Sequence, residues 1–161
     1  MRITYENKLI DPSNISQISE DLRPLVFTNG VFDIIHRGHI SYLRESQSLG
    51  KSLLVALNSD DSTRKLNKGK DRPINNLEDR MSVVSALEAV DFVTWFDEDN
   101  PILLIKSCKP NVLVKGGDWA VDNIVGSDIV KREGGQVVSI PFAYDRSTTE
   151  ILKKIRGKNT S

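Results

Sequence analysis

Five short apolar runs recur along the chain, and the segments between them carry polar or helically spaced residues. The runs are Leu25–Phe27, Ser52–Leu57, Phe92–Phe96, Val112–Lys115 and Val137–Pro141. Short, nearly continuous apolar runs are typical of parallel strands buried on both faces. Their alternation with helical segments predicts an α/β domain with a mainly parallel, five-stranded sheet flanked by helices.

Helix signals follow most of these runs. Apolar spacing predicts one helix from near His36 towards Gly50 and a strong one beginning at Asn76. Asn100–Pro101 combines an N-cap residue with a proline suited to a first turn, whereas Val121–Glu133 is helical but weakly patterned. Ser147, with Glu150 three residues later, matches a capping box and predicts a final helix.

The polar N-terminal stretch is predicted to be an extension of one domain. Residues 1–23 contain a short helical pattern that Ser13 or Asn14 is expected to cap. We expect this stretch to pack on a domain covering residues 24–157, with a frayed tail at 158–161.

Composition narrows the classes of function. The 161 residues include 22 basic and 22 acidic side chains, so charge gives no reason to expect nucleic acid or an anionic membrane as a partner. The single cysteine, Cys108, excludes an internal disulfide and is expected to be buried and inert. Neither a membrane-spanning run nor a signal-peptide pattern is present, which predicts a cytoplasmic protein.

The stretch from Leu25 to His39 carries the candidate chemistry. It reads as a strand, a turn at Asn29–Gly30 and a helix beginning near the protein's two histidines, His36 and His39. A helix N-terminus favours an anion, and histidines three residues apart share a face of the first turn. Gly38 leaves space beside them, so the stretch predicts phosphate binding.

Other readings of the histidine pair remain open. A metal site lacks a third histidine, and Cys108 is remote in sequence. One imidazole can instead serve only to cap the helix. The loop has neither the Walker Gly-x-x-x-x-Gly-Lys-Ser/Thr pattern nor the Rossmann Gly-x-Gly-x-x-Gly spacing, which argues against kinase-type and dinucleotide sites.

Further polar groups lie where predicted strands end or helices begin. Asn58–Ser62 follows one strand, and Gly116–Gly117 follows another and permits close backbone approach. Ser147, Thr148 and Thr149 open the last helix with hydroxyl groups. Arg80, in a first helical turn, either meets a nearby anion or is an exposed arginine without a role. The basic stretch Thr63–Lys70 is either a solvated loop or a lid over phosphates.

These motifs together resemble a known family. Thr28–His39, with its His-x-Gly-His signature, and Ser147–Thr149 are similar to the cytidylyltransferase-like nucleotidyltransferases. Adding Asn58–Ser62, Arg72–Ile74 and Lys115–Trp119 makes the chain look like the adenylyltransferases of ADP-heptose synthesis, from about residue 25 to 157. The resemblance implies a Rossmann-like domain.

The resemblance implies transfer of AMP from ATP, with Mg²⁺, to D-glycero-β-D-manno-heptose 1-phosphate. No covalent enzyme intermediate is implied, and a homodimer is possible. The bifunctional members add a sugar kinase, so a separate heptose kinase and phosphatase are expected upstream. By position, the implied roles are catalytic for His36, His39 and Lys115; nucleotide-binding for Thr28, Asn29, Gly30, Phe32, Asp33, Gly38, Gly116, Asp118, Ser147, Thr148 and Thr149; and substrate-binding for Asn58, Asp60 and Arg80. Asp33 is also implied to orient the site or act through Mg²⁺, while no residue is assigned as a metal ligand.

Two alternatives to adenylyl transfer are kept. One is a cytidylyltransferase acting on glycerol 3-phosphate or a related alcohol phosphate, and the other is a catalytically silent nucleotide-binding module. Gly117 replaces an acid, and Phe142 an arginine, of the glycerol-phosphate pattern, which favours adenylyl transfer. The retained histidine pair argues against a silent module.

Overall fold

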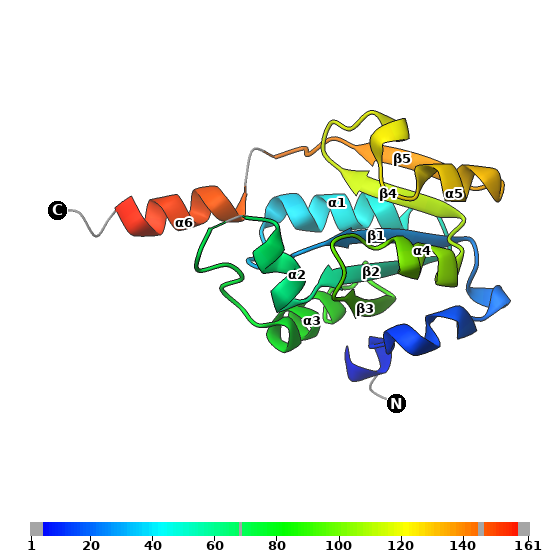
Figure 1. Ribbon diagram of the computed structural model, residues 1–161, viewed down its shortest axis with the longest axis horizontal. Helices are drawn as coiled ribbons and strands as arrows, with labels where there is room; N and C mark the ends of the chain where they lie inside the picture. Colours follow the sequence, from blue (N-terminus) through cyan, green and yellow to red (C-terminus); the bar gives the residue numbers. More distant parts are fainter. Residues whose placement is uncertain (1–4, 68, 145–146, 158–161) are drawn as a thin grey trace.

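One fully parallel sheet forms the centre of the molecule. The computed structural model describes residues 5–67, 69–144 and 147–157 (Figure 1). The strands lie in the order β3–β2–β1–β4–β5 and pair in parallel throughout. They are β1 (Leu25–Gly30), β2 (Ser52–Asn58), β3 (Phe92–Phe96), β4 (Val112–Gly116) and β5 (Gln136–Ile140). The predicted five-stranded α/β fold is therefore confirmed.

Helices cover both faces of this sheet (Figure 1). Side chains of α1 and α3 join one buried apolar cluster, and side chains of α4, α5 and η2 join another on the opposite face. Both clusters exist because the central strands are apolar on both sides. The helices are α1 (Arg37–Gln47), α2 (Asp60–Lys65), α3 (Leu77–Ser85), α4 (Ile102–Cys108), α5 (Ser127–Arg132) and α6 (Thr148–Gly157), with 3₁₀ turns η1 (Tyr5–Lys8), η2 (Pro12–Gln17), η3 (Glu20–Leu22) and η4 (Val121–Asn123).

The order of the strands places a crevice beside β1. The chain passes from β1 to β2 and β3 on one side, then returns to β4 and β5 on the other. Ligands of open α/β sheets bind at such a reversal, outside the carboxyl ends of the strands. In this fold that position lies between the ends of β1 and β4.

The N-terminal segment packs against the sheet but differs locally from expectation. The helical pattern forms the 3₁₀ turns η2 and η3, and the cap of η2 is Asp11 rather than Ser13 or Asn14. The Asp11 carboxylate accepts the backbone N–H of Ser13 at 2.9 Å. Ile15 is 1% exposed and joins the cluster that contains α4. The predicted frayed tail at 158–161 lies outside the described residues.

Two other expectations need correction. Asn29 and Gly30 form no turn, because pairing with β2 extends β1 through both residues. Val121–Glu133 is not one helix but the separate elements η4 and α5. Thr63–Lys65 belongs to α2 rather than to a loop, and Lys68 lies outside the described residues.

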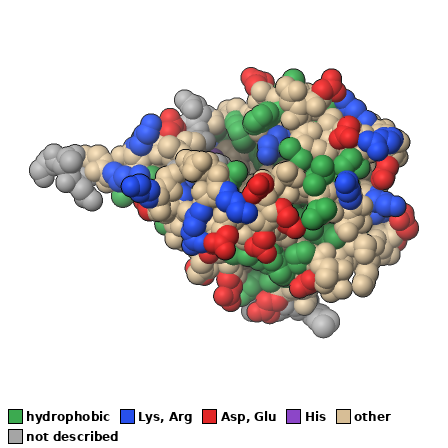
Figure 2. Space-filling view, viewed as in Figure 1, with side chains coloured by type: hydrophobic (Ala, Val, Ile, Leu, Met, Phe, Trp, Pro, Cys, Tyr) green, Lys and Arg blue, Asp and Glu red, His purple; other side chains and the backbone are tan. Residues whose placement is uncertain are grey.

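The remaining expectations concern Cys108 and the surface. Cys108 is buried, and burial raises the pKa of its thiol to about 12, which keeps it protonated and unreactive. Basic and acidic side chains are intermixed over the face in Figure 2. Among the described residues, no helix has both the length and the apolar character needed to cross a bilayer.

Candidate active site

A cavity of about 900 Å³ lies at the carboxyl ends of β1 and β4, the crevice that the strand order creates. Three regions of the chain meet there: the β1–α1 loop, the end of β4 with the chain beyond it, and the start of α6. The residues that line the cavity are Asn29, Gly30, Val31, Phe32, Asp33, His36, His39, Tyr42, Arg72, Lys115, Gly116, Trp119, Phe142, Tyr144, Ser147, Thr148 and Thr149.

The β1–α1 loop turns sharply at Phe32. This residue has φ of 49°, a left-handed conformation that is uncommon for a bulky side chain. Its ring is buried over Gly30, where a side-chain carbon would lie 2.9 Å from the ring. The ring also lies 5.2 Å from that of His39. The strained backbone therefore brings an aromatic ring against one of the two histidines.

His36 is the N-cap of α1. Its Nδ1 accepts the backbone N–H of Gly38 at 3.2 Å, so the proton of the neutral ring lies on Nε2. Burial lowers the pKa of His36 below its ordinary value of 6.5, which favours this neutral form. Capping is thus a real structural role of one imidazole, and it leaves an Nε2–H donor on a side chain that lines the cavity.

The two histidines act as one unit. Their rings stack with centroids 3.9 Å apart and planes 24° apart. Both lie in the first turn of α1, whose free backbone N–H groups favour an anion. An anion in this cavity would therefore meet imidazole donors and the positive end of a helix dipole.

Aromatic rings line the β4 side of the cavity. Gly116 ends β4, and a side-chain carbon there would lie 2.8 Å from the ring of Phe142. The Trp119 indole donates its N–H to the Gly116 carbonyl at 3.0 Å. Phe142 and Trp119 are each about half exposed. The glycine therefore lets two rings approach the strand end, and these rings offer faces on which a planar group can stack.

The start of α6 completes the cavity. The Ser147 hydroxyl accepts the backbone N–H of Glu150 at 3.2 Å, which is the N-cap half of the predicted capping box. Thr148 donates to the carbonyl of Ile34 at 3.3 Å and so connects α6 to the β1–α1 loop. Arg37 lies 3.9 Å from the centroid of the Tyr144 ring. A second helix N-terminus thereby faces the same cavity as the histidines.

The Asp33 carboxylate is buried, and both of its oxygens accept hydrogen bonds from the protein. Oδ2 accepts from Arg72 Nε at 2.7 Å and from the Ile74 N–H at 2.8 Å, and Oδ1 accepts from the Asn75 N–H at 2.8 Å. This arrangement fits an orienting role. It does not fit direct Mg²⁺ ligation, and the described residues contain no cluster of three or more metal-ligating side chains.

Three residues predicted to bind nucleotide are not on the cavity lining. Thr28 is buried within β1 and hydrogen-bonds the Tyr42 hydroxyl at 2.5 Å. Gly38 is buried and donates its N–H to His36. Asp118 is exposed beyond Gly117, where φ of 107° turns the chain away from the strand direction. Thr28 and Gly38 therefore support cavity residues rather than line the cavity.

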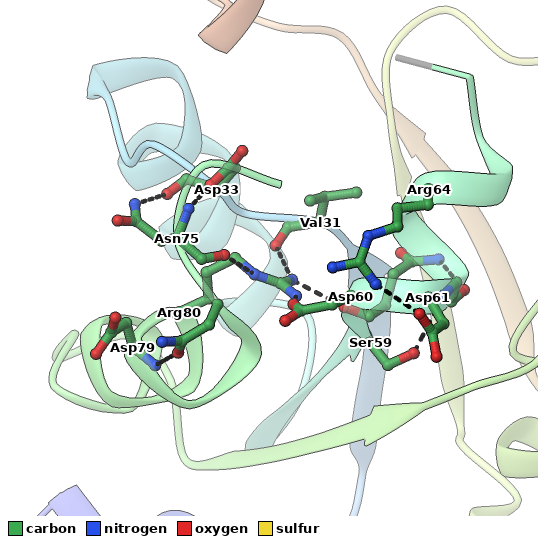
Figure 3. A network of polar contacts seen from close by, with 12 residues as sticks. Val31, Asp33, Ser59, Asp60, Asp61, Arg64, Asn75, Asp79 and Arg80 are labelled. Atoms are coloured by element: carbon green, nitrogen blue, oxygen red, sulfur yellow. Dashed lines mark hydrogen bonds and ion pairs between the residues drawn. The ribbon is translucent and has the colours of Figure 1, made fainter. Parts of the chain in front are cut away.

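The three residues predicted to bind substrate, Asn58, Asp60 and Arg80, also lie off the lining. They belong to a largely buried polar network, in which Figure 3 labels Asp60 and Arg80. Arg80 has no exposed side-chain area, and Nη2 pairs with Asp60 at 2.7 Å. Its Nη1 donates to the carbonyls of Val31 and Asn58, and Nε donates to that of Asn75. The anion that Arg80 was expected to meet is thus Asp60 of the protein. The geometry gives Arg80 a structural role.

Sequence reasoning gave no role to six residues of the lining. Val31, Arg72 and Trp119 occurred only inside quoted motifs. Burial raises the pKa of Tyr42 to about 12, so its hydroxyl stays protonated. In the sequence, the glycines at 116–117 are the feature that could have indicated rings packed closely against the end of β4. The lining residues without an assigned role were Val31, Tyr42, Arg72, Trp119, Phe142 and Tyr144.

Comparison with known proteins agrees with this geometry. Residues 27–154 match the sequence model of the Cytidylyltransferase-like family. A protein of Bordetella bronchiseptica named D-beta-D-heptose 1-phosphate adenylyltransferase is 53% identical over 134 residues, which are 83% of each chain. A bifunctional protein HldE of Blochmanniella floridana is 59% identical over 128 residues, and the chain spans 26% of its length.

A solved structure is similar to this chain in both fold and sequence. A lipopolysaccharide core biosynthesis protein of Thermoplasma volcanium is 30% identical, with a TM-score of 0.61. The match covers 75% of this chain and 98% of that one. The likeness therefore extends over nearly all of that protein's chain.

Replacement of Arg80 tests its structural role. Arg80→Met leaves Asp60 without its cation and three carbonyls without a donor, so we expect a loss of about 3–5 kcal/mol in the free energy of unfolding. Denaturant unfolding measures this. Arg132→Met is the control, because Arg132 pairs with Asp128 on the surface and should matter little. Equal stability of the two variants would contradict the role.

The environment of His36 predicts its titration. Because burial disfavours the charged ring, the neutral form should persist to a lower pH than for an ordinary histidine. An NMR titration of the ring protons should give a pKa below 6.5 for His36, with His39→Asn used to assign the two resonances. A value at or above 6.5 would contradict the buried, capping geometry.

Proposed function

The chain belongs to the Cytidylyltransferase-like family, and we propose that it is an adenylyltransferase that converts ATP and a heptose 1-phosphate into ADP-heptose and pyrophosphate. One observation carries the reaction type: a stacked histidine pair and two helix N-termini face a single cavity at the sheet's switch point. The 53% identity to the Bordetella enzyme supports the substrates, and its name supports the β anomer.

The chemistry is a single displacement at phosphorus. A phosphate oxygen of the sugar phosphate attacks the α-phosphorus of ATP, and the bond to the bridging oxygen of the β-phosphate breaks. Pyrophosphate leaves, and AMP becomes attached to the sugar phosphate. Because no enzyme atom enters these bonds, the protein acts by positioning the reactants and stabilising developing charge.

The residues on the lining have matching roles. His36 Nε2–H donates to an oxygen of the triphosphate, and the stacked ring of His39 contributes to the same anion site. Lys115 supplies a cation from the end of β4. The Ser147 hydroxyl and the backbone N–H groups of the first turn of α6 hold phosphate oxygens. Thr148, whose hydroxyl donates to the Ile34 carbonyl, fixes that turn against the β1–α1 loop. Phe142 and Trp119 provide faces for the base.

Mg²⁺ enters this proposal with its nucleotide. The phosphates of ATP are the ligands expected for Mg²⁺, which keeps several waters and needs few protein carboxylates. Asp33 has no free oxygen for it in the present arrangement. Mg²⁺ is therefore assigned to the substrate, as Mg-ATP, rather than to a site built by the chain.

Under this proposal the chain needs other activities around it. A kinase and a phosphatase that act on the heptose must supply the 1-phosphate, and ATP places the reaction in the cytoplasm. The bifunctional relatives are about three times as long as this chain, and the matched residues span 26–32% of their length. We propose the adenylyltransferase step alone for the residues described. We also propose that the chain can form a homodimer, which a measurement of its mass in solution would test.

Pyrophosphate release tests the substrates. With β-D-heptose 1-phosphate as acceptor, we expect release with ATP to exceed that with CTP or GTP by at least about tenfold, a difference in transition-state free energy of roughly 1.4 kcal/mol. Glycerol 3-phosphate with CTP is the comparison reaction. Activity only in that reaction would make the chain a cytidylyltransferase and overturn the proposal.

Replacement of His36 separates catalysis from binding. His36→Ala removes the Nε2–H donor and should lower kcat by about 10²–10³, the range seen for loss of one preorganised donor. Binding of ATP, measured by calorimetry, should change much less. Unchanged turnover would refute the role of His36, and absence of turnover in the wild type with every nucleotide would favour a silent binding module.

A further inference from the structure

Two buried arginines lie close together in the chain but differ in how the protein uses them. Arg80 has Nε, Nη1 and Nη2 all bonded to protein groups and is absent from the cavity lining. Arg72 has a side chain only 5% exposed, and it lines the cavity. In the part of the chain that the structure describes, the guanidinium of Arg72 bonds to Asp33, through Nε alone.

This single bond leaves most donors of Arg72 unused. A guanidinium carries five N–H donors in a fixed plane, and one of them goes to Asp33. Burying a charged group is costly unless its hydrogen bonds are made. A buried arginine with only a structural role is expected to resemble Arg80, in which every guanidinium nitrogen donates a hydrogen bond to the protein. The four Nη N–H groups of Arg72 lie in the guanidinium plane and are suited to bidentate binding of an anion such as a phosphate.

Asp33 determines where Arg72 lies. Its carboxylate accepts from Arg72, Ile74 and Asn75, and its own carbonyl accepts from the Asn75 amide at 2.8 Å. Four hydrogen bonds thus fix residues 72–75 against the β1–α1 loop, and Figure 3 shows Asp33 and Asn75 bonded in this way. Because Asp33 has no exposed side-chain area, this support is rigid.

The side from which Arg72 reaches the cavity identifies its ligand. Residues 72–75 lie between α2 and α3, in the connection from β2 to β3, on one side of β1. Lys115, Trp119 and Phe142 come from β4 and beyond β5, on the other side of β1. An in-line displacement needs its acceptor and its leaving group on opposite sides of the α-phosphorus. Lys115, which is assigned to the phosphates of ATP, lies on the β4 side. Arg72 is therefore placed on the side that is left for the acceptor.

We infer that Arg72 binds the phosphate of the acceptor, the sugar phosphate, and that Asp33 is its positioning residue. This inference rests on the proposed adenylyl transfer. Through its Nη groups, Arg72 neutralises the acceptor phosphate and aims one of its oxygens at the α-phosphorus. The phosphates of ATP are left to the histidine pair, Lys115 and α6.

Calorimetry on the full chain tests the inference without turnover. The protein is first saturated with α,β-methylene-ATP, and then β-D-heptose 1-phosphate or inorganic phosphate is added as the probe. Arg72→Gln should weaken binding of both probes by about tenfold to a hundredfold, the effect of losing hydrogen bonds to a charged group. Its affinity for α,β-methylene-ATP should stay within about twofold of wild type.

Two further variants control for misfolding and for the general effect of removing an arginine. Arg72→Lys keeps the charge but loses the planar set of guanidinium donors, so its affinity for the two probes should lie between those of wild type and Arg72→Gln. This variant also replaces Arg72→Gln in the test if the glutamine variant does not fold. Arg132→Gln removes a surface arginine and should change neither affinity. In turnover assays, Arg72→Gln should raise the KM for the sugar phosphate and leave that for ATP unchanged.

The outcomes separate this inference from the proposed function. Loss of affinity for the ATP analogue in Arg72→Gln would place Arg72 on the nucleotide and overturn the inference, as would unchanged probe binding or a wild type that binds neither probe. If the wild type binds inorganic phosphate through Arg72 but not heptose 1-phosphate, the inference stands and the proposed acceptor is wrong.

Discussion

The buried guanidinium of Arg80 connects the elements from which the site is built. It donates to the carbonyls of Val31 and Asn58, just beyond the end of β1 and at the end of β2, and it pairs with Asp60 at the start of α2. A buried cation is tolerated only where its partners are all in place. The β1–α1 loop is therefore held to β2, α2 and α3. The histidine pair directly follows this loop and is held in place with it.

The site depends on one side chain serving two purposes. His36 uses Nδ1 to cap α1 and keeps Nε2–H as a donor on the cavity side. The capping and phosphate-binding interpretations of the sequence are thus compatible, because the two ring nitrogens are chemically distinct. The strained backbone of Phe32 completes this unit by placing a ring against His39.

Much of this fold follows from local patterns, whereas the network under the site does not. Short apolar runs predicted all five strands because the sheet is buried on both faces, and Asn76 caps α3 as expected. Asn29 and Gly30 carry a turn signal that pairing with β2 overrides. Apart from Asn75, the partners of Arg80 come from 20 to 49 residues away, so no local pattern distinguishes it from a ligand-binding arginine. Phe142 and Tyr144 lie in a loop, where no periodicity marks them.

The last helix separates the requirements of folding from those of function. Of the residues of α6, only Thr148, in its first turn, is buried, and the pair between Arg156 and Asp71 is largely exposed. Yet this first turn, with Ser147 before it, forms one wall of the cavity. The body of the domain gains little cohesion from α6, while the site gains a second helix N-terminus. This helix therefore contributes to the shape and charge of the cavity much more than to the stability of the fold.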